Sequence, residues 1–162
     1  MIKLTNLLLT LVSWVGYQPQ MALLITALVL ALLYLKFRRE ATWLAISGIG
    51  AYIISNGLKI LVHEARPPLS LLTDWSFPSG HVLTFVACFG FLAYVIFKQF
   101  PISQLRTTIL VLLISLILLV GPSRLYLGDH WLNDVLAGYL LGGVWLAIVV
   151  RLFNSSSHTS RH

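Results

Sequence analysis

The chain has 162 residues, of which 58% are hydrophobic and only 10% are charged, and its formal net charge is +6. Soluble domains carry about 25% charged residues, so a chain of this composition and of mean hydropathy +0.88 cannot cover a soluble globule with polar groups. The basic residues stand singly or in small groups between long apolar stretches, which is typical of loops in an integral membrane protein and excludes a nucleic-acid-binding domain.

The first apolar stretch, Leu7 to Val15, is too short to cross a bilayer, and we expect it to form a short helix at the membrane interface. Five later segments approach or reach the roughly 20 residues that a spanning helix needs. They run from about 20 to 35, 41 to 62, 81 to 98, 105 to 121 and 131 to 152. The sequence therefore predicts an all-α, polytopic transmembrane helical bundle of about five spans plus a short N-terminal interfacial helix. Residues 1–153 are expected to be a single transmembrane domain, and residues 154–162 a polar, disordered tail.

The basic residues predict how these spans are oriented. One group of loops carries most of them: Lys36, Arg38, Arg39, Lys98, Arg106, Arg151 and Arg161. The positive-inside rule makes that side cytoplasmic, so the loops at about 62–79 and 122–130 face outward. Arg66 and Arg124 lie in these outward loops against the rule, which indicates that they have a chemical role.

Two groups of polar residues flank the first outward loop. Lys59 stands near the outer end of its span, where a lysine must reach the surface or have an anionic partner. Arg66 follows it, before a proline pair that stops any helix. The second group, Pro78-Ser79-Gly80-His81, precedes the next span. Ser79 suits a helix cap, Gly80 permits close approach of a ligand, and the free N–H groups at a helix start suit phosphate.

The third group contains Arg124, His130 and Asp134. His130 and Asp134 are four residues apart, so on a helix they share one face. A hydrogen bond between them would give the carboxylate a partner within the membrane boundary and would fix the imidazole tautomer, as behind a catalytic histidine. Five spans bring all three groups to the same membrane face. This set meets the needs of phosphoryl transfer, since it contains two histidines, an orienting aspartate, three cations and a helix N-terminus. The sequence offers no set of carboxylates for two metal ions.

The three groups together resemble the motifs of the type 2 phosphatidic acid phosphatase family. The matching blocks are Lys59-x6-Arg66-Pro67, Pro78-Ser79-Gly80-His81 and Ser123-Arg124-x5-His130-x3-Asp134, and the resemblance covers roughly residues 16 to 152. It implies a metal-independent membrane phosphatase without a cofactor. In that family's mechanism His130 would be the nucleophile that forms a phosphohistidine, Asp134 would orient it, and His81 would protonate the leaving oxygen. The implied phosphate-binding residues are Lys59, Arg66, Ser79, Gly80 and Arg124.

The resemblance also implies a location and a substrate class. Bacterial members act on lipid phosphates and diphosphates at the outer face, so we expect a bacterial inner-membrane protein whose site faces the exterior. Its partners would be the bilayer and a lipid phosphate, with no nucleic acid. Phosphatidylglycerophosphate, phosphatidic acid and undecaprenyl diphosphate stay open as substrates, and the oligomeric state is open as well. Two alternatives are a lipid-linked phosphotransferase on the same site and a catalytically silent protein that binds anionic lipid.

Other residues near these groups have simpler interpretations. Glu64, Asp74 and Asp129 either modulate the site or simply solvate their loops, and we expect the latter. We expect His63 to be a solvated loop histidine rather than a third catalytic one. The Gly138-x-x-x-Gly142 pair in the last span permits close contact with another helix of the bundle.

Overall fold

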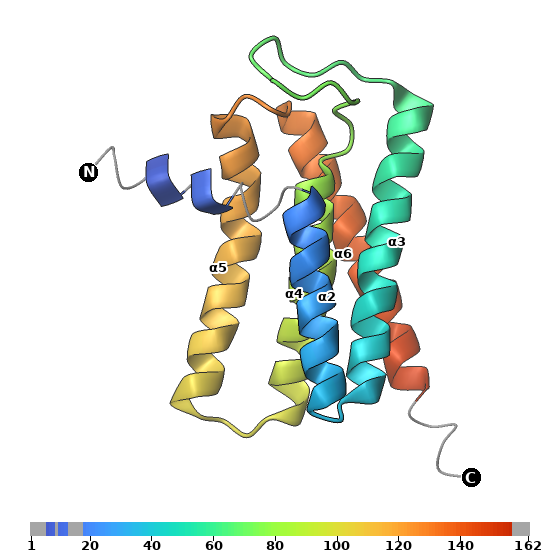
Figure 1. Cartoon of the computed structure of the whole chain (residues 1–162), viewed down its shortest axis with the longest axis vertical. Helices are drawn as coiled ribbons and strands as arrows, with labels where there is room; N and C mark the ends of the chain where they lie inside the picture. Colours follow the sequence, from blue (N-terminus) through green and yellow to red (C-terminus); the bar gives the residue numbers. More distant parts are fainter. Residues whose placement is uncertain (1–5, 9, 13–17, 157–162) are drawn as a thin grey trace.

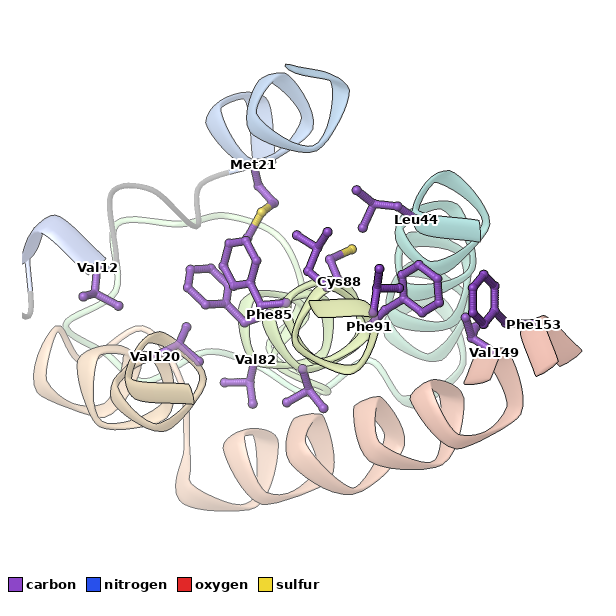
Figure 2. Packing of buried hydrophobic residues seen from close by; sticks show 14 of the residues in the cluster. Val12, Met21, Leu44, Val82, Phe85, Cys88, Phe91, Val120, Val149 and Phe153 are labelled. Atoms are coloured by element: carbon purple, nitrogen blue, oxygen red, sulfur yellow. The ribbon is translucent and has the colours of Figure 1, made fainter. Parts of the chain in front are cut away.

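The computed structural model describes residues 6–8, 10–12 and 18–156. Its main elements are α2 (Gln18–Tyr34), α3 (Arg38–Val62), α4 (Gly80–Gln99), α5 (Gln104–Tyr126) and α6 (Leu132–Ser155). These helices run along a common direction and no strand occurs in the described part of the chain (Figure 1), so the predicted all-α bundle is confirmed. Helix α4 is central, packed against α3, α5 and α6, and its apolar side chains fill the core shown in Figure 2.

Four helices, α3 to α6, are long and apolar enough to cross a membrane, and the chain is therefore an integral membrane protein. Helix α2 is also apolar but has only 17 residues, and it packs alongside α3. The count of five spans stays a prediction. The expected interfacial helix lies partly outside the described residues, although 6–8 and 10–12 are helical and Val12 contacts the core.

The chain beyond the last predicted span is partly helical. Helix α6 continues to Ser155, past the predicted boundary at Leu152, and the Asn154 side chain accepts a hydrogen bond from the Tyr94 hydroxyl of α4. Residues 157–162 lie outside the described residues. The predicted single domain over 1–153 stays a prediction, as does the disorder of the tail.

The loops fall at opposite ends of the bundle (Figure 1). The connections α2–α3 and α4–α5 and the end of α6 lie at one end, while the segments 63–79 and 127–131 lie at the other. Most of the loop lysines and arginines belong to the first end. The candidate catalytic residues belong to the second.

Two glycines of α6 set its close approach to α4. A methyl group on Gly138 would lie 2.9 Å from the Ser79 carbonyl oxygen, and one on Gly142 would lie 3.0 Å from the Leu83 carbonyl oxygen. Only glycine avoids these contacts without a shift of the backbone. The predicted packing of this pair within the bundle is confirmed, and it holds the start of α4 against the start of α6.

Helix α5 is longer than the sequence predicted, because it continues through Pro122 to Tyr126. Proline has no N–H to donate to the carbonyl four residues earlier, which is that of Leu118. The Tyr139 hydroxyl of α6 donates to the Ile117 carbonyl oxygen at 2.8 Å, lies 3.2 Å from the Leu118 oxygen, and accepts from the Gly121 N–H at 3.2 Å. It therefore satisfies backbone groups beside the proline. Arg124 consequently lies on a helix, with a fixed direction, rather than in the loop where the sequence placed it.

Candidate active site

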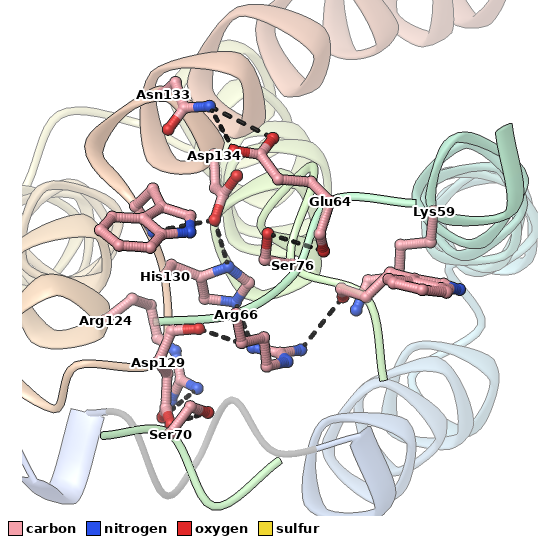
Figure 3. A network of polar contacts seen from close by, with 12 residues as sticks. Lys59, Glu64, Arg66, Ser70, Ser76, Arg124, Asp129, His130, Asn133 and Asp134 are labelled. Atoms are coloured by element: carbon pink, nitrogen blue, oxygen red, sulfur yellow. Dashed lines mark hydrogen bonds and ion pairs between the residues drawn. The ribbon is translucent and has the colours of Figure 1, made fainter. Parts of the chain in front are cut away.

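The candidate residues gather at the end of the bundle formed by the segments 63–79 and 127–131 (Figure 3). A cavity of about 950 Å³ lies there, with walls from α2, α3 and α4 and from both segments. The predicted site residues that line it are Lys59, Arg66, Gly80, His81 and His130. Three others, Ser79, Arg124 and Asp134, are fully buried and do not reach it.

His130 is held by Asp134, as the sequence predicted. The Nδ1 atom of His130 lies 3.2 Å from the Asp134 Oδ2 atom, and both side chains are buried. The same oxygen accepts a hydrogen bond of 2.8 Å from the Trp131 N–H. Asp134 therefore fixes the first turn of α6 and the orientation of the imidazole together.

The contacts of the imidazole define its tautomer. Nη1 of Arg66 lies 3.4 Å from Nε2 of His130. Since a guanidinium offers only donors and a carboxylate only acceptors, Nδ1 carries the proton toward Asp134, and Nε2 keeps a lone pair at the cavity wall. Burial lowers the pKa of His130; the hydrogen bond with Asp134 opposes this effect, and the charges of Arg66 and Arg124 add to it, so the pKa stays below its ordinary value. The imidazole is thus neutral at pH 7, the form that a nucleophile requires.

Lys59 and Arg66 share one anionic partner, Asp74. Its Oδ2 lies 2.5 Å from Lys59 Nζ and its Oδ1 lies 2.8 Å from Arg66 Nη2. Burial acts to raise the pKa of Asp74, but the hydrogen bond and charge of Lys59, together with Arg66, outweigh it and hold the pKa below its ordinary value. The expectation that Asp74 only solvates its loop was wrong, because two neighbouring cations need a counter-charge. The sequence contained a signal for this pairing, since Asp74 is the sole acid between Arg66 and Ser79.

Arg124 pairs with Asp129 at the end of α5. Nη2 of Arg124 lies 2.5 Å from Asp129 Oδ2, and neither side chain is more than 7% exposed. The Ser70 hydroxyl donates to the other carboxylate oxygen at 3.0 Å, and Arg66 Nη1 donates to the Asp129 backbone carbonyl at 2.7 Å. The expectation that Asp129 solvates a loop was also wrong. A buried arginine needs a buried carboxylate, and Asp129 is the nearest acid after Arg124 in the sequence.

Ser79 occupies the cap position at the start of α4, but its hydroxyl makes no capping hydrogen bond. The Oγ atom is buried and has no hydrogen-bond partner among the described residues. Its backbone N–H donates to the Asp134 carbonyl oxygen at 3.0 Å, which joins the second motif directly to the third. Gly80 and His81 follow as the first two residues of α4 and open onto the cavity.

Residues around the cavity anchor the segment 63–79 rather than extend the catalytic set. His63 ends α3, is exposed, and meets the ring of Trp75 edge-on at 4.9 Å, so it lies outside the cavity wall. The Trp131 Nε1–H donates to the Ala65 carbonyl at 2.9 Å. In the part of the chain that the structure describes, no three His, Cys, Asp or Glu side chains gather as a metal site would require.

Comparisons with known proteins identify similar sequences. The family model of the PAP2 superfamily matches residues 40–157. Phosphatidylglycerophosphatase B of Bacillus subtilis is 34% identical over 94 residues, which are 56% of this chain and 46% of that protein. Undecaprenyl-diphosphatase of Sulfolobus acidocaldarius is 32% identical over 132 residues, which are 74% of this chain and 58% of that protein. The chain thus spans about half the length of these curated relatives.

Two solved structures are similar as well. The crystal structure of a transmembrane PAP2 type phosphatidylglycerolphosphate phosphatase from Bacillus subtilis matches with a TM-score of 0.81 at 25% identity, over 93% of this chain and 77% of that one. Aquifex aeolicus LpxE shares the fold, with a TM-score of 0.65 at 21% identity over 91% of this chain and 86% of that one. The matched residues 40–157 include all three sequence motifs. The chain belongs to the PAP2 superfamily, as the spacing of its motifs predicted.

Proposed function

We propose that this protein hydrolyses lipid phosphates or diphosphates through a phosphohistidine formed at His130, without a metal ion or other cofactor. The observation that carries the proposal is the geometry of His130, whose Nδ1 faces Asp134 and whose Nε2 lies beside Arg66 at a cavity wall. The names of the two curated relatives, phosphatidylglycerophosphatase B and undecaprenyl-diphosphatase, support lipid phosphates as the substrate class.

In the proposed reaction, Nε2 of His130 attacks the phosphorus atom and the bond between phosphorus and the lipid oxygen breaks. His81 gives its proton to that leaving oxygen. Water then attacks the phosphohistidine and loses a proton to His81, and the P–N bond breaks, which releases inorganic phosphate and restores neutral His130.

Positive groups would stabilise the charge that spreads over the phosphoryl oxygens. Lys59 and Arg66 line the cavity, while Arg124 acts from the buried layer behind it. The first N–H groups of α4 add donors, since a helix N-terminus favours phosphate. A phosphate that binds Lys59 and Arg66 takes the place of the Asp74 carboxylate, whose side chain is 52% exposed and can move aside.

The remainder of the cavity supports a substrate with an apolar chain. Away from the charged groups its wall is formed mainly by α2 and α3 and includes Met21, Ala22, Ile25, Gly48 and Ile49. These side chains offer hydrocarbon or small surfaces rather than hydrogen-bonding groups. When the phosphate binds at the polar end, its lipid chain can therefore lie along an apolar wall.

We also propose that the site faces the extracytoplasmic side of a bacterial inner membrane. The opposite end of the bundle carries most of the loop cations, and such an end is cytoplasmic by the positive-inside rule. Leu71 at the site end is 95% exposed and Ile102 at the other end is 89% exposed. In intact cells a membrane-impermeant maleimide should label Leu71→Cys and spare Ile102→Cys, since native Cys88 is buried. Labelling of Ile102→Cys alone would reverse the orientation.

Phosphate release by the detergent-purified protein tests the reaction. Phosphatidylglycerophosphate, phosphatidic acid and undecaprenyl diphosphate should be offered in parallel with excess EDTA. His130→Asn should lower the rate at least about 1,000-fold, because an amide cannot form a phosphohistidine. His63→Asn is the matched control: His63 is exposed, lies outside the cavity, and has φ 53°, which asparagine tolerates. A phosphoenzyme trapped from radiolabelled substrate should be acid-labile and absent from His130→Asn.

Three results would contradict the proposal. Loss of activity in EDTA would point to a metal ion, and equal losses in His63→Asn and His130→Asn would remove the special role of His130. Transfer of the phosphoryl group to a lipid or sugar acceptor, with no free phosphate, would identify a phosphotransferase.

A further inference from the structure

Ser55 is a buried serine near the site that belongs to none of the three motifs. It lies on α3, four residues before Lys59, and is only 3% exposed. Its Oγ atom has no hydrogen-bond partner among the described residues. A buried hydroxyl without a partner is costly, so a group outside the chain is the natural acceptor to consider.

Several other helical hydroxyls among the described residues have hydrogen-bond partners. Thr42, Thr107 and Ser155 each donate to the carbonyl four residues earlier, at 3.0 to 3.1 Å. This is the ordinary behaviour of serine and threonine in a helix. Ser47, which is buried on the same helix as Ser55, donates to the Ala87 carbonyl of α4 at 2.9 Å. Ser55 makes neither kind of bond, although both lie within the reach of a serine in α3.

The position of Ser55 brings its hydroxyl to the catalytic end of the cavity. Ser55 lines the same cavity as Lys59, His81 and His130. A methyl group on Gly80 would lie 2.8 Å from the Ser55 Oγ atom, so the hydroxyl sits directly against the first residue of α4. That residue belongs to the helix turn whose N–H groups lack partners within the helix. Two kinds of donor, a hydroxyl and a helix N-terminus, thus adjoin at one place.

We propose that the Ser55 hydroxyl donates a hydrogen bond to the bound substrate on the side of the phosphate that carries the lipid. The proposal rests on the proposed function. At 1.5 Å of rise per residue, Ser55 lies about 6 Å deeper along α3 than Lys59, toward the apolar part of the cavity. The lipid chain of a bound substrate extends from the phosphate in that direction. Ser55 therefore meets the ester oxygen or, in a diphosphate, the second phosphate, and helps His81 to hold the leaving group.

Substitution of Ser55 with a matched control tests this contact. In Ser55→Ala, kcat/KM for the best lipid substrate should fall by about 10-fold to 100-fold, as expected when a hydrogen bond to a charged group is lost. Ser55→Cys keeps nearly the same volume with a much weaker donor and should show a similar loss, even where the alanine variant folds poorly. Ser47→Ala removes a structural hydroxyl from the same helix, so it should lower thermal stability while kcat/KM stays near that of the wild type.

Binding of inorganic phosphate gives a readout that does not depend on turnover. Phosphate should raise the melting temperature of the wild type and of Ser47→Ala, and should raise it less in both Ser55 variants. Folded Ser55 variants that match the wild type in kcat/KM and in phosphate stabilisation would overturn the contact while leaving the proposed function intact. A wild type that releases no phosphate from any lipid, but still loses phosphate stabilisation on Ser55 substitution, would overturn the proposed function and support the contact.

Discussion

The cations on the two sides of the site are neutralised by carboxylates of different exposure. On one side the buried Arg124 meets Asp129, whose side chain is only 7% exposed and is also held by Ser70. On the other side Lys59 and Arg66 meet Asp74, whose side chain is 52% exposed on the segment 63–79. Both sides join a carboxylate to cations, one cation for Asp129 and two for Asp74. The carboxylate is buried on the first side and half-exposed on the second.

That difference indicates two tasks. A carboxylate that is buried and hydrogen-bonded on both oxygens cannot leave without stranding a charge, so Asp129 fixes the direction of Arg124. The half-exposed Asp74 carboxylate can turn toward water, and an incoming phosphate can replace it as the counter-charge of Lys59 and Arg66. The structure thus combines a permanent counter-ion with a replaceable one, and substitutions of the two aspartates should separate them.

The largest effect is expected for Asp129→Asn. It removes the carboxylate that pairs with the fully buried Arg124, and breaking such a pair costs about 3–5 kcal/mol. Thermal unfolding in detergent should show the loss of stability, and phosphate release should fall with it because Arg124 is no longer held in place. Asp74→Asn, measured in parallel, should cost less stability, because the Asp74 carboxylate is 52% exposed, although its partners Lys59 and Arg66 are largely buried. Equal destabilisation by the two substitutions would show that exposure does not distinguish the pairs.

A smaller effect of opposite sign is expected for Asp74→Asn on phosphate binding. The substitution removes a carboxylate that competes with phosphate for Lys59 and Arg66. Lys59 and Arg66 are only 9% and 6% exposed, but water screens the 52% exposed carboxylate, so its competition with phosphate should be on the order of 1 kcal/mol. The concentration of inorganic phosphate that half-inhibits the enzyme should then fall by about two-fold to five-fold. Inhibition assays at fixed ionic strength measure this change. Weaker inhibition in the variant would mean that Asp74 positions the cations for phosphate instead of competing with it.

The fold was largely predictable because its signals are local. Apolar length alone located helices α2 to α6, and the spacing of Gly138 and Gly142 anticipated the close contact of α6 with α4. The end of α5 was not predictable in the same way. Pro122 signals a helix boundary by itself, and the Tyr139 hydroxyl that compensates for it comes from a different helix. A rule based on neighbouring residues cannot include such a donor.

In the candidate site, too, contacts between residues close in sequence were predictable and contacts made through folded loops were not. The contact of His130 with Asp134 followed from their spacing, since residues four apart share a helical turn. The roles of Asp74 and Asp129 did not, because each pairs with a cation through a folded loop. Ser55 stands four residues before Lys59 in an apolar helix, and no motif includes it. Its burial without a partner and its place at the cavity wall distinguish it from Ser47.

The smallest expected effect concerns the pH dependence of kcat/KM and its change in Asp74→Asn. Burial and the charges of Arg66 and Arg124 hold the pKa of His130 below its ordinary value, against the hydrogen bond with Asp134. Below that pKa, Nε2 is protonated and cannot attack, so kcat/KM should fall about ten-fold per pH unit, starting at a pH more acidic than about 6.5. Removal of a negative charge near Arg66 cannot favour protonation of His130. The acidic limb of Asp74→Asn should therefore stay in place or move to slightly lower pH, and a move to higher pH would show that Asp74 acts on His130 by a route other than charge.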